Sequence, residues 1–142
     1  MKKYNWDEFI KDTEILANNI IDSKFKPDML VAIARGGWIP TIFLSDMLKV
    51  ETISSIGMSY QDKKRTKLTA YSIPLLNSQI KSILLIEDRL ESAKSLKEAK
   101  NFFERKCLHV RTCSLFIHSK SIVIPDYYIE SNDEEIIFPW EL

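Results

Sequence analysis

The chain has 142 residues, of which 45% are hydrophobic and 28% are charged, and its formal net charge is zero. This length supports one substantial core, so we expect a single domain over residues 1–142. The balanced charge argues against binding of nucleic acid or of an anionic membrane surface through an overall field, so any anion site must be local. No apolar run approaches the length of a bilayer span and the N-terminus has no apolar signal core, which predicts a cytoplasmic protein.

The first half of the chain alternates helical and extended patterns. Apolar residues at helical spacing predict an amphipathic helix over residues 5–23. A continuous apolar run at 29–33 indicates a strand buried on both faces, and a helix with a proline in its first turn follows to about Lys49. Residues 52–60 carry the β-branched and apolar side chains of a second strand, and 61–67 form a polar, mostly basic loop.

The second half repeats this alternation. A short strand is expected at 68–73, a buried strand at 83–86, a helix from about 94 to 106, and strands at 110–117 and 126–129. Strands alternating with helices predict an α/β fold with a mostly parallel, doubly wound sheet flanked by helices. Such sheets bind ligands beyond the carboxyl ends of their strands, which is where chemistry is expected.

Cysteines and histidines give no sign of a metal centre. Cys107, Cys113, His109 and His118 lie in or beside one predicted strand without regular metal-ligand spacing. We therefore expect reduced, structural thiols and no zinc site.

The loop after the strand at 83–86 combines acidic and small residues. Glu87 and Asp88 form an acidic pair that can accept hydrogen bonds from two adjacent hydroxyls or approach a divalent cation. Ser92, Ala93 and Ser95 allow backbone amides and a helix N-terminus to surround a phosphate. Together these features describe a ribose 5-phosphate site. The alternative is a solvated strand end followed by a serine helix cap.

Three segments carry a resemblance to one family. The apolar strand, acidic pair, acid at Glu91 and small hydroxyl residues resemble the phosphoribosyl diphosphate (PRPP) motif of type I phosphoribosyltransferases. Residues 34–40, Ala-Arg-Gly-Gly-Trp-Ile-Pro, are similar to the diphosphate loop of that family. The tail segments 125–128 and 138–141 resemble those of the small xanthine, guanine and hypoxanthine phosphoribosyltransferases of bacteria and archaea.

The resemblance implies an enzyme of nucleotide salvage. It would transfer the phosphoribosyl group of PRPP to a purine base and release pyrophosphate, with magnesium as cofactor, and would fold as a type I phosphoribosyltransferase with a small C-terminal hood. The family also suggests a homodimer. The implied PRPP-binding residues are Arg35, Gly36, Arg65, Glu87, Asp88, Ser92, Ala93, Lys94 and Ser95, with Glu87 and Asp88 as metal carboxylates.

The implied catalytic residues are Arg35 and Glu91. Arg35 would face the charge of the diphosphate, and Glu91 lies where the family carries the acid that relays the purine's proton, a task that suits a carboxylate with its pKa raised toward neutrality. An exposed charge is the alternative for Glu91. The basic loop with Arg65 and Lys67 resembles a mobile flap over PRPP, with a solvated charged face as its alternative.

Three positions depart from the family pattern. Ala93 replaces a glycine, and its Cβ is expected to oppose a left-handed backbone and weaken phosphate binding. His118 stands where a lysine usually donates to the exocyclic oxygen, with Lys120 as a possible stand-in. Glu135 stands where an aromatic residue usually stacks on the purine, while Ile136 would still contact the base.

These departures leave two other hypotheses beside the enzyme. A catalytically impaired regulatory relative would keep affinity for PRPP or a nucleotide without turnover. A generic doubly wound domain with an unrelated anion site would show no preference for PRPP over inorganic phosphate.

Overall fold

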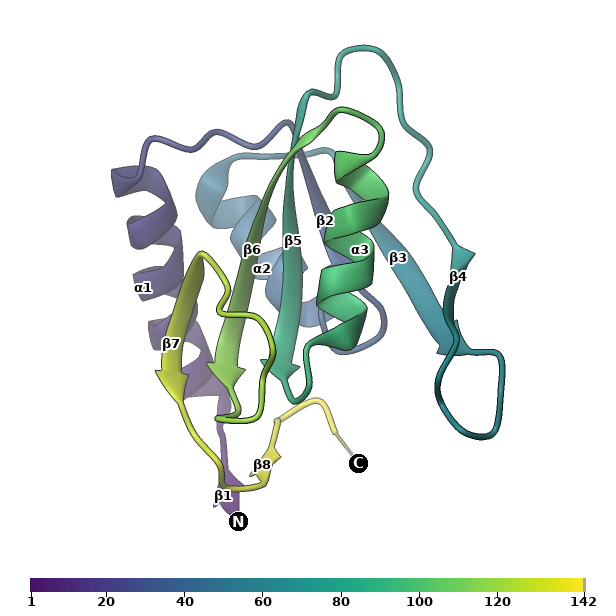
Figure 1. Cartoon of the computed structure of the whole chain (residues 1–142). Helices are drawn as coiled ribbons and strands as arrows, with labels where there is room; N and C mark the ends of the chain where they lie inside the picture. Colours follow the sequence, from purple (N-terminus) through teal and green to yellow (C-terminus); the bar gives the residue numbers. More distant parts are fainter. Residues whose placement is uncertain (142) are drawn as a thin grey trace.

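The computed structural model describes residues 1–141, and a six-stranded sheet forms its centre (Figure 1). The strand order is β4-β3-β2-β5-β6-β7, and every neighbouring pair is parallel except β3 and β4. In chain order the elements are β1 (Lys2–Lys3), α1 (Trp6–Asp22), β2 (Met29–Ile33), α2 (Trp38–Leu48), β3 (Ile53–Tyr60), β4 (Leu68–Ser72), β5 (Ser82–Leu90), α3 (Lys94–Glu104), β6 (His109–Ile117), β7 (Tyr127–Ser131) and β8 (Ile136–Ile137).

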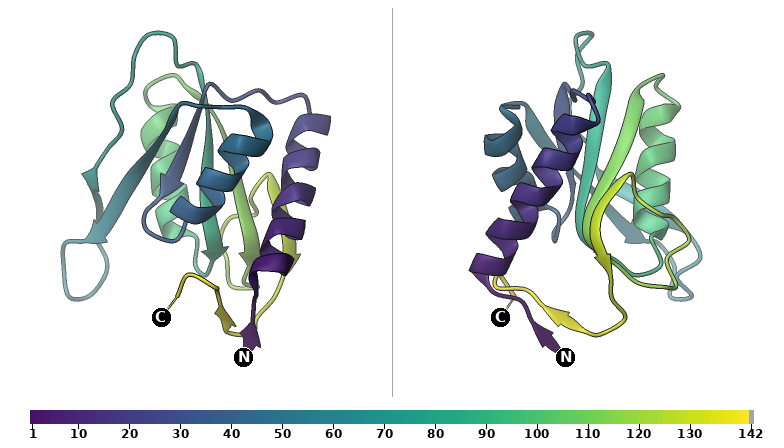
Figure 2. Two further views of the ribbon diagram at one scale, coloured as in Figure 1. Left: turned by 180° about the vertical axis from the view of Figure 1, so that it is seen from behind. Right: turned by 90° about the vertical axis from the view of Figure 1, so that its left-hand side faces the viewer.

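Helices cover both faces of the sheet. Seen along the sheet, α1 and α2 lie on one face and α3 lies on the other (Figure 2). The first face buries Phe9, Leu16 and Ile20 of α1, which begins at a capping box between Asn5 and Glu8. The second face packs α3 over the opposite side of the strands. This two-sided burial explains why β2 reads as an unbroken apolar run.

The centre of the sheet contains its switch point. β2 and β5 are adjacent and parallel. The chain leaves β2 through α2 on one face and leaves β5 through α3 on the other (Figure 2). The loops after these two strands therefore open between neighbouring carboxyl ends, where doubly wound sheets bind ligands.

The C-terminal hood, residues 132–141, lies next to these strand ends (Figure 1). Its β8 pairs with β1 in a small parallel sheet. Phe138 stacks on Trp140 with ring centroids 4.8 Å apart, and Trp140 meets the edge of Phe9 at 5.0 Å. Aromatic packing against α1 thus anchors the hood to the body of the protein.

The predicted fold class is confirmed, and one strand differs from its prediction. β5 does not end at Ile86 but continues to Leu90, because Glu87, Arg89 and Leu90 pair with β6. Cys113 is buried in the core, as expected of a structural thiol. Cys107 is exposed just after α3, so the prediction that it is a structural core thiol is wrong. Within the described residues, no helix is long and apolar enough to cross a membrane.

Candidate active site

The diphosphate-type loop touches the PRPP-type motif directly. Gly36 packs so closely on Asp88 that a Cβ at this glycine would lie 2.4 Å from Asp88 Oδ2. Gly37 is equally confined, because its Cβ would lie 2.2 Å from the carbonyl oxygen of Ile86. The two glycines are required by close approach, since neither has a positive φ. Arg35 remains exposed beside this contact.

An open cavity of about 760 Å³ lies over this contact. Its lining consists of Arg35, Gly36, Trp38, Ile39, Asp88, Trp140 and Glu141. The hood therefore supplies two walls, an aromatic one and an acidic one, that face the diphosphate-type loop. No pattern in the sequence predicts that α2 and the hood meet here, or that Trp38 and Glu141 have a site role.

A second, smaller cavity of about 150 Å³ surrounds residues 91–95. Ser92, Lys94 and Ser95 line it at the start of α3. In the described part of the chain, the N-cap residue Ala93 offers no side-chain cap, and the first amide of α3, that of Lys94, makes only a long hydrogen bond of 3.4 Å to the Ser92 hydroxyl. The amides of this first turn can therefore donate to a ligand. The positive end of the helix dipole adds to their attraction for an anion, and this pocket suits one phosphate group.

Ala93 adopts the left-handed conformation that the sequence suggested it would oppose. Its φ is 64° and its ψ is 19°, so the loop keeps the shape expected of a glycine at this position. The methyl group is buried beside Leu90 and Leu96 in the core under α3. The expectation that the Cβ blocks this backbone is therefore wrong. Its cost is about 1 kcal/mol of strain, and burial of the methyl group partly offsets it.

Glu87 and Asp88 lie in different environments although they are consecutive. Successive strand residues point to opposite faces, and accordingly Glu87 lines the phosphate pocket while Asp88 faces Gly36. Burial, together with the nearby charge of Asp88, raises the pKa of Glu87 to about 8. Burial also raises the pKa of Asp88, although its hydrogen bond from the backbone N–H of Arg89, 2.7 Å long, favours the ionised form.

The indole of Trp140 also affects Asp88. It favours the charged carboxylate and so partly opposes the rise in the pKa of Asp88 that burial causes. Its Nε1 nevertheless finds no partner of regular hydrogen-bond geometry among residues 1–141, so we regard the contact as a weak, polar one.

Glu87 and Asp88 suit a magnesium ion that takes only some of its ligands from the protein. Oxygen donors of this kind suit Mg²⁺, which usually retains water and phosphate ligands. No group of three or more His, Cys, Asp or Glu residues within the described chain forms a metal cage. A cation at Asp88 therefore has to take its remaining ligands from the substrate and from water.

The basic loop between β3 and β4 stands beside the phosphate pocket. The guanidinium of Arg65 lies 4.6 Å from the ring centre of Tyr60, and both residues line that pocket. Asp62 holds the loop by accepting hydrogen bonds from the backbone N–H groups of Thr66 and Lys67. A neighbouring cavity of about 670 Å³ carries four lysines, namely Lys64, Lys67, Lys94 and Lys97.

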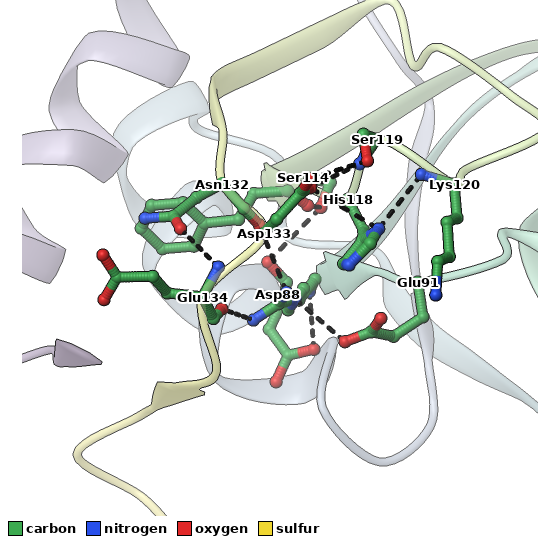
Figure 3. A network of polar contacts seen from close by, with 11 residues as sticks. Asp88, Glu91, Ser114, His118, Ser119, Lys120, Asn132, Asp133 and Glu134 are labelled. Carbon is green, nitrogen blue, oxygen red and sulfur yellow. Dashed lines mark hydrogen bonds and ion pairs between the residues drawn. The ribbon is translucent and has the colours of Figure 1, made fainter. Parts of the chain in front are cut away.

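The predicted base-binding residues come together only in part. His118 begins the loop after β6, and its Nδ1 accepts a hydrogen bond of 3.0 Å from the backbone N–H of Lys120 (Figure 3). Glu135 is exposed just before β8. The side chain of Ile136 is buried in the core, so only its backbone remains for a base.

Glu91 is held by a residue that the sequence did not single out. Its carboxylate is 69% exposed and lies 3.0 Å from Nε of Arg89, whose side chain is only 10% exposed. Figure 3 shows Glu91 extending from the strand end toward the same region as His118 and the turn at 132–134. The pattern of residues along β5 gives no reason to expect that Arg89 contacts Glu91.

These features define an α/β protein with two adjoining cavities at the switch point of its sheet. A family model described as the phosphoribosyl transferase domain matches residues 4–142. The chain belongs to the phosphoribosyltransferase family.

Individual relatives point to the purine branch. A xanthine-guanine phosphoribosyltransferase from Desulfotalea psychrophila is 26% identical over 137 residues, which cover 96% of this chain and 84% of the relative. The xanthine-guanine-hypoxanthine phosphoribosyltransferase of Helicobacter pylori is similar in structure, with a TM-score of 0.91, 26% identity and coverage of 99% and 94%. A purine phosphoribosyltransferase from Pyrococcus horikoshii has a TM-score of 0.85, 25% identity and coverage of 99% and 93%. The predicted family and class of enzyme are confirmed, and a non-catalytic relative is not favoured.

Proposed function

We propose that this protein transfers the phosphoribosyl group of PRPP to a 6-oxopurine and releases pyrophosphate. The observation that carries the proposal is the contact between Gly36 and Asp88, which brings the diphosphate-type loop and the PRPP-type motif into one site. The names of the relatives from Desulfotalea psychrophila and Helicobacter pylori support a purine as acceptor.

The chain's own residues suit each part of this reaction. The α3 N-terminus and Ser92 hold the 5-phosphate, and Arg35 with the backbone at Gly36 stabilises the charge that develops on the diphosphate as its bond to the anomeric carbon breaks. A purine ring nitrogen forms the new bond to that carbon. Glu91 accepts the proton that the purine ring loses. Asp88 would hold a bound magnesium ion, which would supply positive charge to the diphosphate.

His118 supports a 6-oxopurine rather than a 6-aminopurine. Because its Nδ1 accepts the backbone N–H of Lys120, the neutral imidazole carries its proton on Nε2. This N–H can donate to an exocyclic oxygen but offers nothing to an exocyclic amino group. The expected order of substrates therefore places hypoxanthine, guanine or xanthine before adenine.

A base panel tests the proposal. The folded protein is incubated with PRPP, Mg²⁺ and each of hypoxanthine, guanine, xanthine and adenine, and pyrophosphate release is measured. We expect turnover that needs Mg²⁺ and is fastest with one of the three 6-oxopurines. Absence of turnover with all four bases, from protein with a normal melting transition, contradicts the proposal.

We further propose that residues 1–142 act as one domain within a cytoplasmic homodimer. The exposed apolar side chains Ile10, Ile21 and Ile42 on α1 and α2 are compatible with such a contact. Light scattering at two protein concentrations tests the dimer, and a monomer at both would contradict it.

A further inference from the structure

Arg89 connects the two sides of the candidate base site. It lies on β5 between Asp88 and Leu90, and its side chain crosses to the hood. There Nη1 donates to the backbone carbonyl of Glu134 at 2.5 Å, and Nη2 donates to that of Asn132 at 3.2 Å. Its Nε lies 3.0 Å from Glu91 Oε1. One guanidinium thus contacts the PRPP-type motif and the hood turn at 132–134.

The same turn is held from its other side by the His118 loop. The backbone N–H and the hydroxyl of Ser119 donate to the carboxylate of Asp133, at 2.8 and 2.7 Å. The Asp133 carboxylate also lies 3.5 Å from Nδ1 of His118. Asp133 sits between the two carbonyls that Arg89 contacts, so a shift of the turn moves the His118 loop as well (Figure 3).

The Nε–H group of Arg89 lies near Glu91 but does not form a well-aligned hydrogen bond with it. Although Glu91 is near, Nε has no partner of regular hydrogen-bond geometry within residues 1–141. A buried guanidinium whose donor is poorly satisfied is costly to the folded protein unless another acceptor completes it. The Glu91 carboxylate is largely exposed, so a bound ligand can reach it, whereas Arg89 is fixed by its two carbonyl contacts.

We propose that Arg89 is a positioning residue for the purine half of the reaction. It holds Glu91 within reach of the purine ring and keeps the hood turn, with His118 behind it, at the correct distance from β5. The proposal deepens the proposed function and rests on it for the identity of the base. It assigns no direct chemistry to Arg89, which acts through Glu91 and the turn.

Ligand binding tests this role without requiring turnover. Calorimetry compares ribose 5-phosphate with inosine 5′-monophosphate on the wild-type protein, Arg89→Met and Arg89→Lys. Because Arg89 also lines the phosphate pocket, Arg89→Met should weaken both ligands, but inosine 5′-monophosphate at least about tenfold more than ribose 5-phosphate. Arg89→Lys should recover part of the loss because it retains the charge. Arg105→Met, at an exposed arginine after α3, is the matched control and leaves both affinities unchanged.

Kinetics test the coupling to Glu91. In the wild-type background we expect Arg89→Met to lower kcat at least about tenfold. In a Glu91→Gln background its further effect should be smaller, because only the contribution of the hood turn is left. Equal loss of both ligands, no loss of either, or the same fold-change in both kinetic backgrounds would overturn the proposal. If the wild type shows no turnover, the proposed function fails, and the calorimetric comparison still decides the role of Arg89.

Discussion

The phosphate pocket and the base region lie in one site, but their donors come from different parts of the chain. The amides of residues 92–95 at the start of α3 come from one short stretch of backbone, and the side chains of Arg65, Glu87 and Arg89 complete the lining of the phosphate pocket. The base region is assembled from β5, the loop after β6 and the hood, and it depends on side chains such as Arg89 and His118. Backbone amides tolerate substitutions as long as the chain keeps its path, which is why Ala93 preserves the pocket. A site built from side chains changes its ligand preference when one of those side chains is substituted.

The largest expected effect is on the diphosphate loop. Gly36→Ala places a Cβ 2.4 Å from Asp88 Oδ2, so the loop and the carboxylate have to separate. We expect kcat/KM for PRPP to fall about 10³-fold, because aligned charge stabilisation is lost together with the carboxylate position. Ribose 5-phosphate affinity serves as the control, since the phosphate pocket does not contain Gly36. A variant with normal kcat/KM would contradict the role of this contact.

Glu91 tests the base side of the comparison. Glu91→Gln keeps the size of the side chain but cannot accept the purine's proton. We expect kcat to fall about 10²-fold, the usual scale for loss of a proton-transfer group, while KM for PRPP stays within about twofold. Steady-state kinetics with both substrates varied measure the two effects separately. A rise in KM for PRPP at unchanged kcat would place Glu91 on the phosphate side instead.

Glu87 tests whether a buried carboxyl group of the phosphate pocket lowers the stability of the fold. Its pKa is about 8 in the folded protein against 4.5 for an unperturbed glutamate, so the folded state keeps a proton that the unfolded chain has already lost. The free energy of unfolding therefore falls as pH rises from about 4.5 to about 8. Glu87→Gln should flatten this decline and raise Tm at pH 8 by roughly 5–10 °C.

Thermal unfolding between pH 5 and 9 measures the effect of Glu87. The carboxylates of Asp28, Asp62 and Asp133 have lowered pKa values and titrate below this window, so they do not obscure it. Parallel curves for the wild type and Glu87→Gln would show that Glu87 is ionised in the folded protein.

His118 tests the preference of the base region. His118→Ala removes the Nε2 donor, and we expect kcat/KM for the preferred 6-oxopurine to fall about tenfold, the value of one hydrogen bond. Adenine turnover, where measurable, should not change. His118→Lys should recover the 6-oxopurine activity because it restores a donor. An equal loss for both classes of base would show that His118 acts through its loop and not through the exocyclic group.

The smallest effect is expected at Ala93. Ala93→Gly relieves about 1 kcal/mol of left-handed strain but loses a buried methyl group worth about 0.8 kcal/mol, so the stability of the protein should hardly change. Calorimetry with ribose 5-phosphate should show an affinity within about threefold of the wild type. A tenfold gain would mean that the methyl group still restricts the phosphate loop.

Much of the fold followed from local pattern. The buried runs at β2 and β5, the helical spacing of α1 and the break at the basic loop lie close to their predicted positions. β5 was predicted too short, because Glu87 and Asp88 look like a strand end in the sequence, while pairing with β6 extends the strand through them. Charged residues at the end of a buried strand hide its continuation when the neighbouring strand supplies the hydrogen bonds.

The sequence by itself determined the order of elements around residues 83–104, a buried strand, a loop of small residues and a helix start, because these features are contiguous in the chain. Only the tertiary structure decided the rest. It placed Glu87 and Asp88 in separate cavities, brought Trp140 to the diphosphate loop and carried Arg89 across to the hood. Two of these features bring together residues that are distant along the chain, and packing of the sheet, α1 and the hood determines them. The third, the separation of Glu87 from Asp88, arises because successive strand residues point to opposite faces.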